Sequence, residues 1–288
     1  MHIGVTFPQT EFGADRSAIR AYCTAAVAAG YDYLLAYDHV LGADPANRPG
    51  WSGYTDTDSF HEVFTLFGYA AGIAPELDLV TGVLILPQRQ TALVAKQAAQ
   101  IDILTAGTFR LGVGVGWNAV EFEALGENFA TRGRREEEQI GLLRRYWTEP
   151  VVTFDGDFDR VTEAGLNPMP IQRPIPIWIG GTSDIAIDRT ARIGDGWFPM
   201  GVVDEEQRKK LARLKAGILE AGRDPAAVGI EARIDTNRSG EANWERNIAA
   251  WKDAGATHLS INTMNVGLDL AGHIGMIERF APIAMAYR

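Results

Sequence analysis

The stretch from Gly82 to Asn118 constrains the fold more than any other part of the chain. An apolar run, GVLIL, leads through a polar loop into the amphipathic segment ALVAKQAAQIDIL, and a second apolar run, FRLGVGV, opens into Gly116, Trp117 and Asn118. Short apolar runs are typical of buried strands, and the segment between them is long enough to return as a helix. The pattern predicts a strand–helix–strand unit of a parallel sheet, in which ligands bind beyond the carboxyl ends of the strands.

The same alternation continues along the whole chain. Strands are predicted over Ile3–Phe7, Tyr33–Ala36, Leu79–Leu86, Phe109–Val115, Ile175–Ile179, Gly196–Pro199, Val228–Ile234 and His258–Ile261. Helices are predicted over Ser17–Ala29, Phe60–Gly72, Ala92–Leu104, Arg134–Trp147, Ser183–Ile193, Glu205–Ala221, Trp244–Ala254 and Leu270–Tyr287. Eight such units in 288 residues favour an α/β fold of the closed (β/α)8 TIM barrel type, which needs about 250 residues. We therefore expect residues 1–288 to form one domain.

Two loops are long for a compact fold. The first, Leu41–Ser59, follows the second strand, and the other, Pro150–Pro174, lies between the fourth helix and the fifth strand and contains the hairpin-like sequence VVTFDGDFDRV. Long loops in compact domains are usually functional or mobile, so both are candidates for controlling access to a site.

The composition excludes several classes of protein. The net charge of −10 argues against a nucleic-acid or anionic-membrane partner, and no apolar run is long enough to span a membrane. The single cysteine, Cys23, excludes an internal disulfide framework and suits a reducing cytoplasm. The N-terminal MHIGVTFPQT is too short and too strand-like for a signal peptide. We expect a cytoplasmic protein that acts on a small molecule.

Asp38 and His39 are the most informative polar pair at a strand end. An imidazole can donate or accept a proton or hydrogen-bond a cofactor near neutral pH. A neighbouring carboxylate can set its tautomer, although adjacent residues of a strand point in opposite directions. A purely structural histidine that caps the loop is the alternative.

Gly180–Gly181–Thr182–Ser183 is the second candidate site, because it stands directly before a predicted helix. Exposed backbone N–H groups, the helix N-terminus and the hydroxyls together favour a bound phosphate. An ordinary capped turn is the alternative. Gly112, Gly114 and Gly116 do not have the dinucleotide-binding spacing, and indicate instead a flat ligand or tight barrel packing.

Metal-dependent chemistry has little support in the sequence. The five histidines are scattered, with no H-x-H or H-E-x-x-H pattern, and no G-x-S-x-G elbow is present. We therefore predict no metal site.

Five segments resemble the bacterial luciferase-like superfamily, and within it the F420-dependent oxidoreductases. The segments are AYDHV (36–40), TGVLILPQRQTALVAKQAAQID (81–102), TAGTFRLGVGVGWNAVEFEALG (105–126), RGRREEE (132–138) and PIWIGGTSDIAIDRTARIGDGWFP (176–199). They occur in order over about two hundred residues, and their combination is specific although the single pieces are not. The resemblance implies a (β/α)8 barrel that holds a flavin-type ring at its C-terminal face, and a homodimer.

The resemblance also assigns roles to individual residues. Asp38 and His39 are implied to lie near the ring, with His39 as a proton donor or positioning group. Thr81, Gly82 and Val83 match the third strand, where the family often has a non-proline cis peptide bond, and Trp117 and Asn118 match the loop after the fourth strand. Gly180, Gly181 and Thr182 match the backbone site for the cofactor phosphate.

One departure limits the comparison. Sugar-phosphate dehydrogenases of this family carry a glutamate where this chain has Trp117. An alcohol-oxidising acid–base pair is therefore not supported, and the resemblance predicts F420, or alternatively FMN, without a defined substrate. Two other classes remain open: a metal- or phosphate-dependent barrel hydrolase or isomerase, and a non-catalytic flavin-binding protein.

Overall fold

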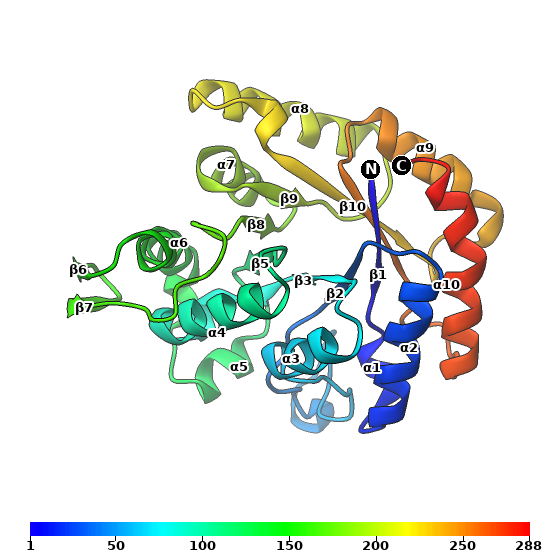
Figure 1. Cartoon of the computed structure of the whole chain (residues 1–288), viewed down its shortest axis with the longest axis horizontal. Coiled ribbons are helices and arrows are strands. Elements are labelled where there is room, and N and C mark those ends of the chain that lie inside the picture. The colour runs from blue at the N-terminus through cyan, green and yellow to red at the C-terminus, as the bar shows by residue number, and fades with distance from the viewer.

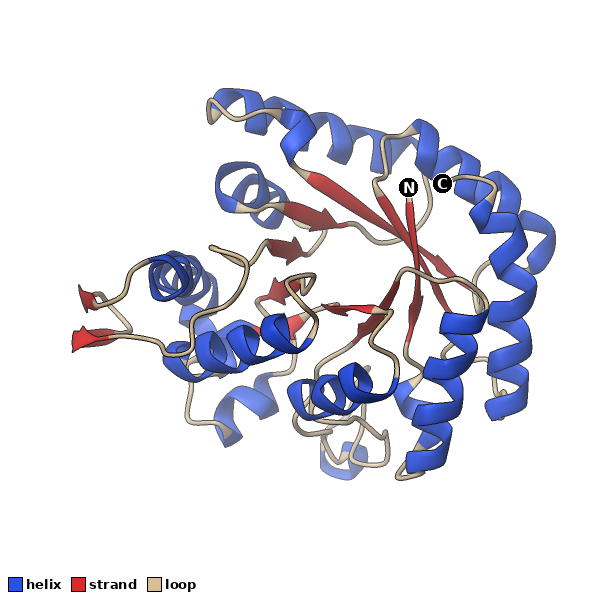
Figure 2. Ribbon diagram, in the orientation of Figure 1, coloured by secondary structure: helices blue, strands red, loops and turns tan.

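The strands form a parallel barrel, and the helices surround it (Figures 1 and 2). The computed structural model describes all residues from Met1 to Arg288. The barrel strands are β1 (His2–Thr6), β2 (Tyr33–Ala36), β3 (Asp78–Thr81), β4 (Leu84–Ile85), β5 (Leu111–Gly114), β8 (Ile177–Gly180), β9 (Gly196–Phe198), β10 (Gly229–Asp235) and β11 (His258–Asn262). Their order is β3-β2-β1-β11-β10-β9-β8-β5-β4. The predicted α/β barrel is confirmed.

The barrel closes between β3 and β5. Val80 and Arg110 form a parallel bridge, and the N–H of Arg110 donates to the carbonyl of Leu79 at 3.1 Å. The predicted strand Leu79–Leu86 is therefore two pieces, β3 and β4, interrupted at Gly82 and Val83. The peptide bond between these two residues is cis, as the resemblance implies.

The helices begin where the sequence supplies caps. They are α1 (Gln9–Phe12), α2 (Arg16–Ala28), α3 (Val63–Ile73), α4 (Thr91–Leu104), α5 (Ala119–Ala124), α6 (Arg132–Thr148), α7 (Asp184–Ile193), α8 (Glu205–Glu220), α9 (Trp244–Asp253) and α10 (Leu270–Met285). The side chains of Asp15, Ser183 and Asp204 accept N–H bonds from the first turns of α2, α7 and α8. The short helices α1 and α5 lie outside the segments that were predicted to be helical. No helix combines the length and the apolar character needed to cross a bilayer.

The predicted hairpin in the second long loop is present. Strands β6 (Val152–Asp155) and β7 (Arg160–Ala164) pair antiparallel and project beside α6 (Figure 1). The Glu138 carboxylate on α6 accepts the N–H groups of Asp157, Phe158 and Asp159, which anchors the turn of the hairpin. This loop is therefore tied to the outside of the barrel.

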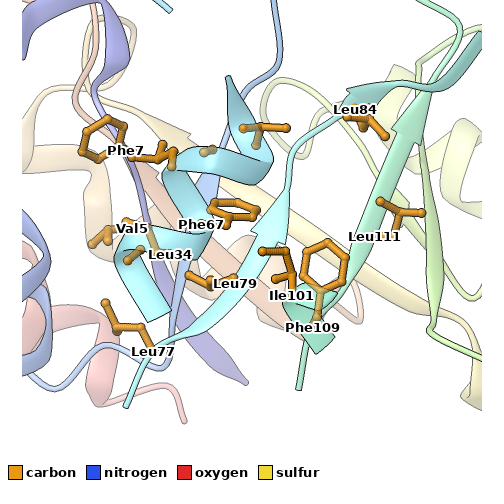
Figure 3. Close-up of a cluster of buried hydrophobic side chains, with 14 of the residues drawn as sticks. Val5, Phe7, Leu34, Phe67, Leu77, Leu79, Leu84, Ile101, Phe109 and Leu111 are labelled. Carbon is orange, nitrogen blue, oxygen red and sulfur yellow. The ribbon is translucent and has the colours of Figure 1, made fainter. Parts of the chain in front are cut away.

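The main hydrophobic core lies between the strands and the helices. Phe67 of α3 and Ile101 of α4 lie beside Leu79 and Phe109, and all four are buried (Figure 3). Successive residues of a strand point to opposite faces, so the alternate residues enter the barrel. This alternation explains why polar side chains such as Glu231 and Arg233 occur on one strand with buried Ala232 and Ile234.

A buried ion pair forms part of the barrel interior. Arg110 donates to Glu231 Oε2 at 2.8 Å, and the Tyr33 hydroxyl donates to Oε1 of the same carboxylate at 2.8 Å. The Arg110 guanidinium also lies 4.7 Å from the ring centres of both Tyr33 and Trp178. Because the charges of Arg110 and Glu231 compensate each other, we infer that this ion pair supports the cavity above it.

Candidate functional site at the C-terminal mouth of the barrel

An apolar cavity of about 270 Å³ opens at the carboxyl ends of the strands. It contains Gly82, Val83, Trp117, Gly180 and Gly181 from the residues predicted for the cofactor. Its apolar walls come from Leu35, Val83, Ile85, Val115 and Phe198. Residues from seven parts of the sequence thus meet at the end of the barrel where ligands bind in this fold.

The glycines of this mouth make room for one side chain, that of Val83. A Cβ atom added to Gly114 would lie 2.7 Å from Val83 Cγ2, and one added to Gly180 would lie 2.9 Å from Val83 Cγ1. A Cβ atom on Gly112 would lie 1.9 Å from the carbonyl oxygen of Thr81. Of the two interpretations of the alternate glycines, tight barrel packing therefore describes Gly112 and Gly114.

A second cavity, of about 330 Å³, adjoins the first. Both are lined by Gly82, Val83, Ile85 and Trp117, and the second adds Asp38 and His39. The mouth therefore has two adjoining parts, which meet at the Gly82–Val83 segment.

His39 contacts a carboxylate that the sequence did not indicate. Its Nδ1 atom lies 3.1 Å from Oε1 of Glu121, in the first turn of α5. An ionised Glu121 can only accept a hydrogen bond, so Nδ1–H is the donor. This contact assigns the Nδ1–H tautomer to the neutral ring and leaves Nε2 as its acceptor nitrogen. The adjacent Asp38, which the sequence offered as a possible partner, is bonded to Ile85 and Arg89 instead.

Glu121 is fully buried and holds several donors at once. Besides His39 it accepts the N–H groups of Val40 at 2.8 Å and Leu41 at 3.2 Å, and Nε2 of Gln88 at 3.0 Å. Burial alone would raise the pKa of Glu121, but hydrogen bonds from His39 and Gln88 outweigh it and hold this pKa below its usual range. Glu121 is therefore an anion that positions both His39 and the start of the first long loop.

Asp38 fixes the chain that follows Val83. Its Oδ2 atom accepts the N–H of Ile85 at 3.1 Å, and its Oδ1 atom accepts from the Arg89 guanidinium at 2.7 Å. Burial raises the pKa of Asp38 above its ordinary value, although the Arg89 charge opposes that shift. Asp38 lines the cavity, and its hydrogen bonds make it a support for β4.

Aromatic side chains of Tyr54 in the first long loop, of Phe60 directly after it and of Trp117 surround the His39 ring. Ring centres of Tyr54, Phe60 and Trp117 lie 4.9, 4.8 and 5.6 Å from the His39 ring. Trp117 remains 45% exposed and leans against Trp51, with ring centres 5.8 Å apart. Trp117 thus forms a wall of the mouth.

The turn from β8 into α7 offers unused hydrogen-bond donors. The N–H groups of Gly181, Thr182 and Ser183 donate to no acceptor in the protein, whereas the Gly181 carbonyl accepts from Trp197 Nε1 at 2.8 Å. Gly181 has a φ of 131°, and a Cβ atom there would lie 2.8 Å from Ala186 Cβ. The segment is a capped turn, because Ser183 caps α7. It also keeps N–H groups without a protein partner, as a phosphate site would need.

Two predicted residues lie behind the cavities. The Thr81 hydroxyl donates to the carbonyl of Gly112 at 2.7 Å and is fully buried. Asn118 caps α5 through Oδ1 and donates to the Leu41 carbonyl at 3.1 Å through Nδ2. Their side-chain atoms are used within the protein, so the structure places them as supports of the mouth.

Arg233 is a site residue that sequence reasoning missed. It lines both cavities and donates to the Tyr37 hydroxyl at 2.8 Å, and its Nε lies 2.7 Å from Asp235 Oδ1. Burial raises the pKa of Tyr37 to about 12, although Arg233 opposes the shift. A charged residue among apolar neighbours of a predicted strand was the available signal. No group of three or more His, Cys, Asp or Glu side chains is placed to hold a metal ion.

The chain matches one family over nearly its whole length. The model of that family, described as luciferase-like monooxygenase, matches residues 1–277. An uncharacterized protein of Mycobacterium tuberculosis is 35% identical over 205 residues, which are 69% of this chain and 70% of the relative. An FMNH2-dependent dimethylsulfone monooxygenase of Pseudomonas putida is 34% identical over 190 residues, covering 65% of this chain and 50% of the relative.

A relative with a different cofactor is also similar. An F420-dependent hydroxymycolic acid dehydrogenase of Mycobacterium tuberculosis is 30% identical over 237 residues, covering 81% of this chain and 61% of the relative. Among solved structures, the monooxygenase RslO1 from Streptomyces bottropensis has a TM-score of 0.78 at 18% identity, over 100% of this chain and 99% of that one. An F420-dependent secondary alcohol dehydrogenase has a TM-score of 0.78 at 17% identity, over 98% of both chains. At these identities the two structures show the fold alone.

Proposed function

The chain belongs to the luciferase-like monooxygenase family, and from that premise we propose that it is an oxidoreductase that uses F420, or alternatively FMN, on a small organic substrate. The observation that carries the proposal is the pair of adjoining cavities at the barrel mouth. The apolar one reaches the free N–H groups at Gly181, and the other reaches His39. A flat apolar ring with an anionic tail fits the first, and a substrate fits the second.

The residues present suit such a cofactor. Val83, Ile85 and Phe198 offer apolar contacts to a ring, and the N–H groups of Gly181 and Thr182 offer donors to a phosphate. A bound deazaflavin or flavin would supply hydride transfer, and a flavin also reaction with O2. The relatives include proteins named for each cofactor, and the motif combination favours F420.

The protein contributes a histidine that can exchange a proton and aromatic side chains that enclose it. His39 has Nδ1 directed at Glu121, so its Nε2 atom is the nitrogen that exchanges a proton with a substrate in the cavity. Trp117, Tyr54 and Phe60 surround the imidazole ring of His39 and limit the access of water to it. Asp38 and Arg89 keep the chain after Val83 in place.

The cofactor assignment is tested by titrating the purified protein with F420 and FMN in parallel and following fluorescence. Thr182→Asp should weaken binding of the cofactor by at least about tenfold relative to Thr182→Asn, because the two variants differ only in one negative charge beside the phosphate. Thr182 makes no side-chain hydrogen bond, so neither variant removes a contact. Absence of saturable binding by both cofactors would contradict the proposed function.

His39→Asn separates proton transfer from binding. An asparagine amide retains a donor for Glu121 but cannot exchange a proton with a substrate as an imidazole can. We expect the dissociation constant of the cofactor to change less than about threefold and the single-turnover rate to fall by about 10²–10⁴-fold. The rate is followed as loss of reduced cofactor with a substrate found by screening small carbonyl compounds. An unchanged rate would assign His39 a structural role.

A further inference from the structure

The mouth of the barrel continues beyond Arg233 into a third cavity, of about 350 Å³. Its walls come from the segment after β9, the carboxyl end of β10 and the first turns of α9. Arg233, Asp235 and Arg238 line both this cavity and the one that contains His39. The two cavities therefore adjoin at these three residues.

The charges around this cavity do not cancel. Asp235 is bonded by Arg233 and accepts from Nδ2 of Asn262 at 2.9 Å, so the only carboxylate of the lining is already neutralised. Arg238 and Arg246 also line the cavity, and neither forms an ion pair or a side-chain hydrogen bond. Three arginines and one aspartate leave two positive charges in excess, in a chain whose net charge is −10. Such a local excess attracts anions.

Neutral donors accompany the two free arginines. Ser239 is only 7% exposed, and its oxygen accepts from Asn247 Nδ2 at 2.8 Å, so its own hydroxyl hydrogen remains available. The Asn243 amide lines the cavity and makes no side-chain hydrogen bond. Guanidinium groups with neighbouring hydroxyl and amide donors form the usual surroundings of a carboxylate, sulfonate or phosphate.

We propose that this cavity binds the anionic group of the substrate, so that the substrate is a small organic acid or acid ester whose uncharged part extends past Arg233 to His39. This assignment extends the proposed function. That the bound anion is a substrate rests on the proposed function. The site expected for the cofactor phosphate is at Gly181, directly after β8. The new subsite is a different place, at the carboxyl end of β10. Its arginines would select anionic compounds over neutral ones of the same shape.

Matched acid and amide probes test the subsite. Phenylbutyrate, phenylbutanesulfonate and the neutral phenylbutyramide are titrated calorimetrically into wild type, the Arg238→Gln/Arg246→Gln double variant and the control Arg208→Gln. Arg208 is an exposed arginine of α8 that lines none of these cavities and has no side-chain partner. We expect wild type to bind at least one acid about tenfold more tightly than the amide, and the double variant to lose that preference. Equal binding of acid and amide by wild type, or retention of the preference by the double variant, would overturn the subsite.

A second arm distinguishes substrate from cofactor. F420 and FMN are titrated into the same three proteins, and the dissociation constants should agree within about threefold. A cofactor that binds about tenfold more weakly to the double variant would place the cofactor's own anionic tail in this cavity and overturn the assignment to substrate. If wild type binds neither cofactor but keeps its preference for the acid, the proposed function fails while the anion subsite stands.

Discussion

Replacing Glu121 by alanine should lower the free energy of unfolding by about 3–5 kcal/mol, because it strips the partner from buried donors on two loops. The N–H groups of Val40 and Leu41, the Gln88 amide and His39 all bond this one carboxylate. Chemical denaturation at neutral pH measures the loss. A change below about 1 kcal/mol would show that water replaces the carboxylate and that Glu121 does not organise the site.

The matched variant Glu121→Gln isolates the charge. The pKa of Glu121 is lowered in the folded protein, so its ionised form contributes stability that is complete above the unfolded value and is lost as pH falls through the folded one. As pH falls below the usual range of a glutamate carboxyl, the free energy of unfolding of wild type should therefore decrease more steeply than that of Glu121→Gln. Parallel pH profiles in the two proteins would contradict this assignment.

Arg89→Met should destabilise the protein by about 3–5 kcal/mol at neutral pH, because it leaves the Asp38 carboxylate buried without its cation. Arg89 donates to Asp38 at 2.7 Å, and Asp38 is 2% exposed. Methionine keeps much of the apolar stem, so the change tests the charge more than the packing. Urea denaturation measures the free energy of unfolding.

The pH dependence of the stability of Arg89→Met tests whether the unpaired Asp38 carboxylate causes the loss. Burial already raises the pKa of Asp38, and loss of the Arg89 charge should raise it further. A carboxyl group with a raised folded pKa loses stability as pH increases through that pKa, so the variant should recover part of its stability at about pH 5 relative to about pH 8. The double variant Asp38→Asn/Arg89→Met should be more stable at neutral pH than Arg89→Met alone. A double variant as unstable as the single one would mean that Arg89 acts through packing.

The fold could be predicted from local patterns because a barrel strand carries its own signature. The apolar runs at Leu79–Leu86 and Ile175–Ile179 need burial on both sides, and the helical segments between them return the chain in the same direction. The break at Gly82 and Val83 escaped this reasoning, since the run remains apolar through it. Only the resemblance to a family pointed there.

The candidate site could be located from the sequence for the same reason that the barrel could. In parallel strands every carboxyl end reaches the same rim, so Asp38, His39, Trp117 and Gly181 had to lie near one another once the strands were placed. The hydrogen-bond partners of these residues could not be predicted from the placement of the strands. The sequence offered Asp38 as a possible partner of His39, with the reservation that adjacent side chains of a strand point apart. The carboxylate that reaches His39 comes from residue 121.

The sequence by itself determined the barrel, the rim on which ligands bind and the glycine turn before α7, because these depend on periodicity and on backbone chemistry within a few residues. The tertiary structure decided the partners of each charge: Glu121 for His39, Arg89 for Asp38, and none for Arg238 and Arg246. These two contacts join residues 82 and 51 positions apart. Such contacts are set by strand register and by where each helix begins, and these are fixed only when the barrel closes.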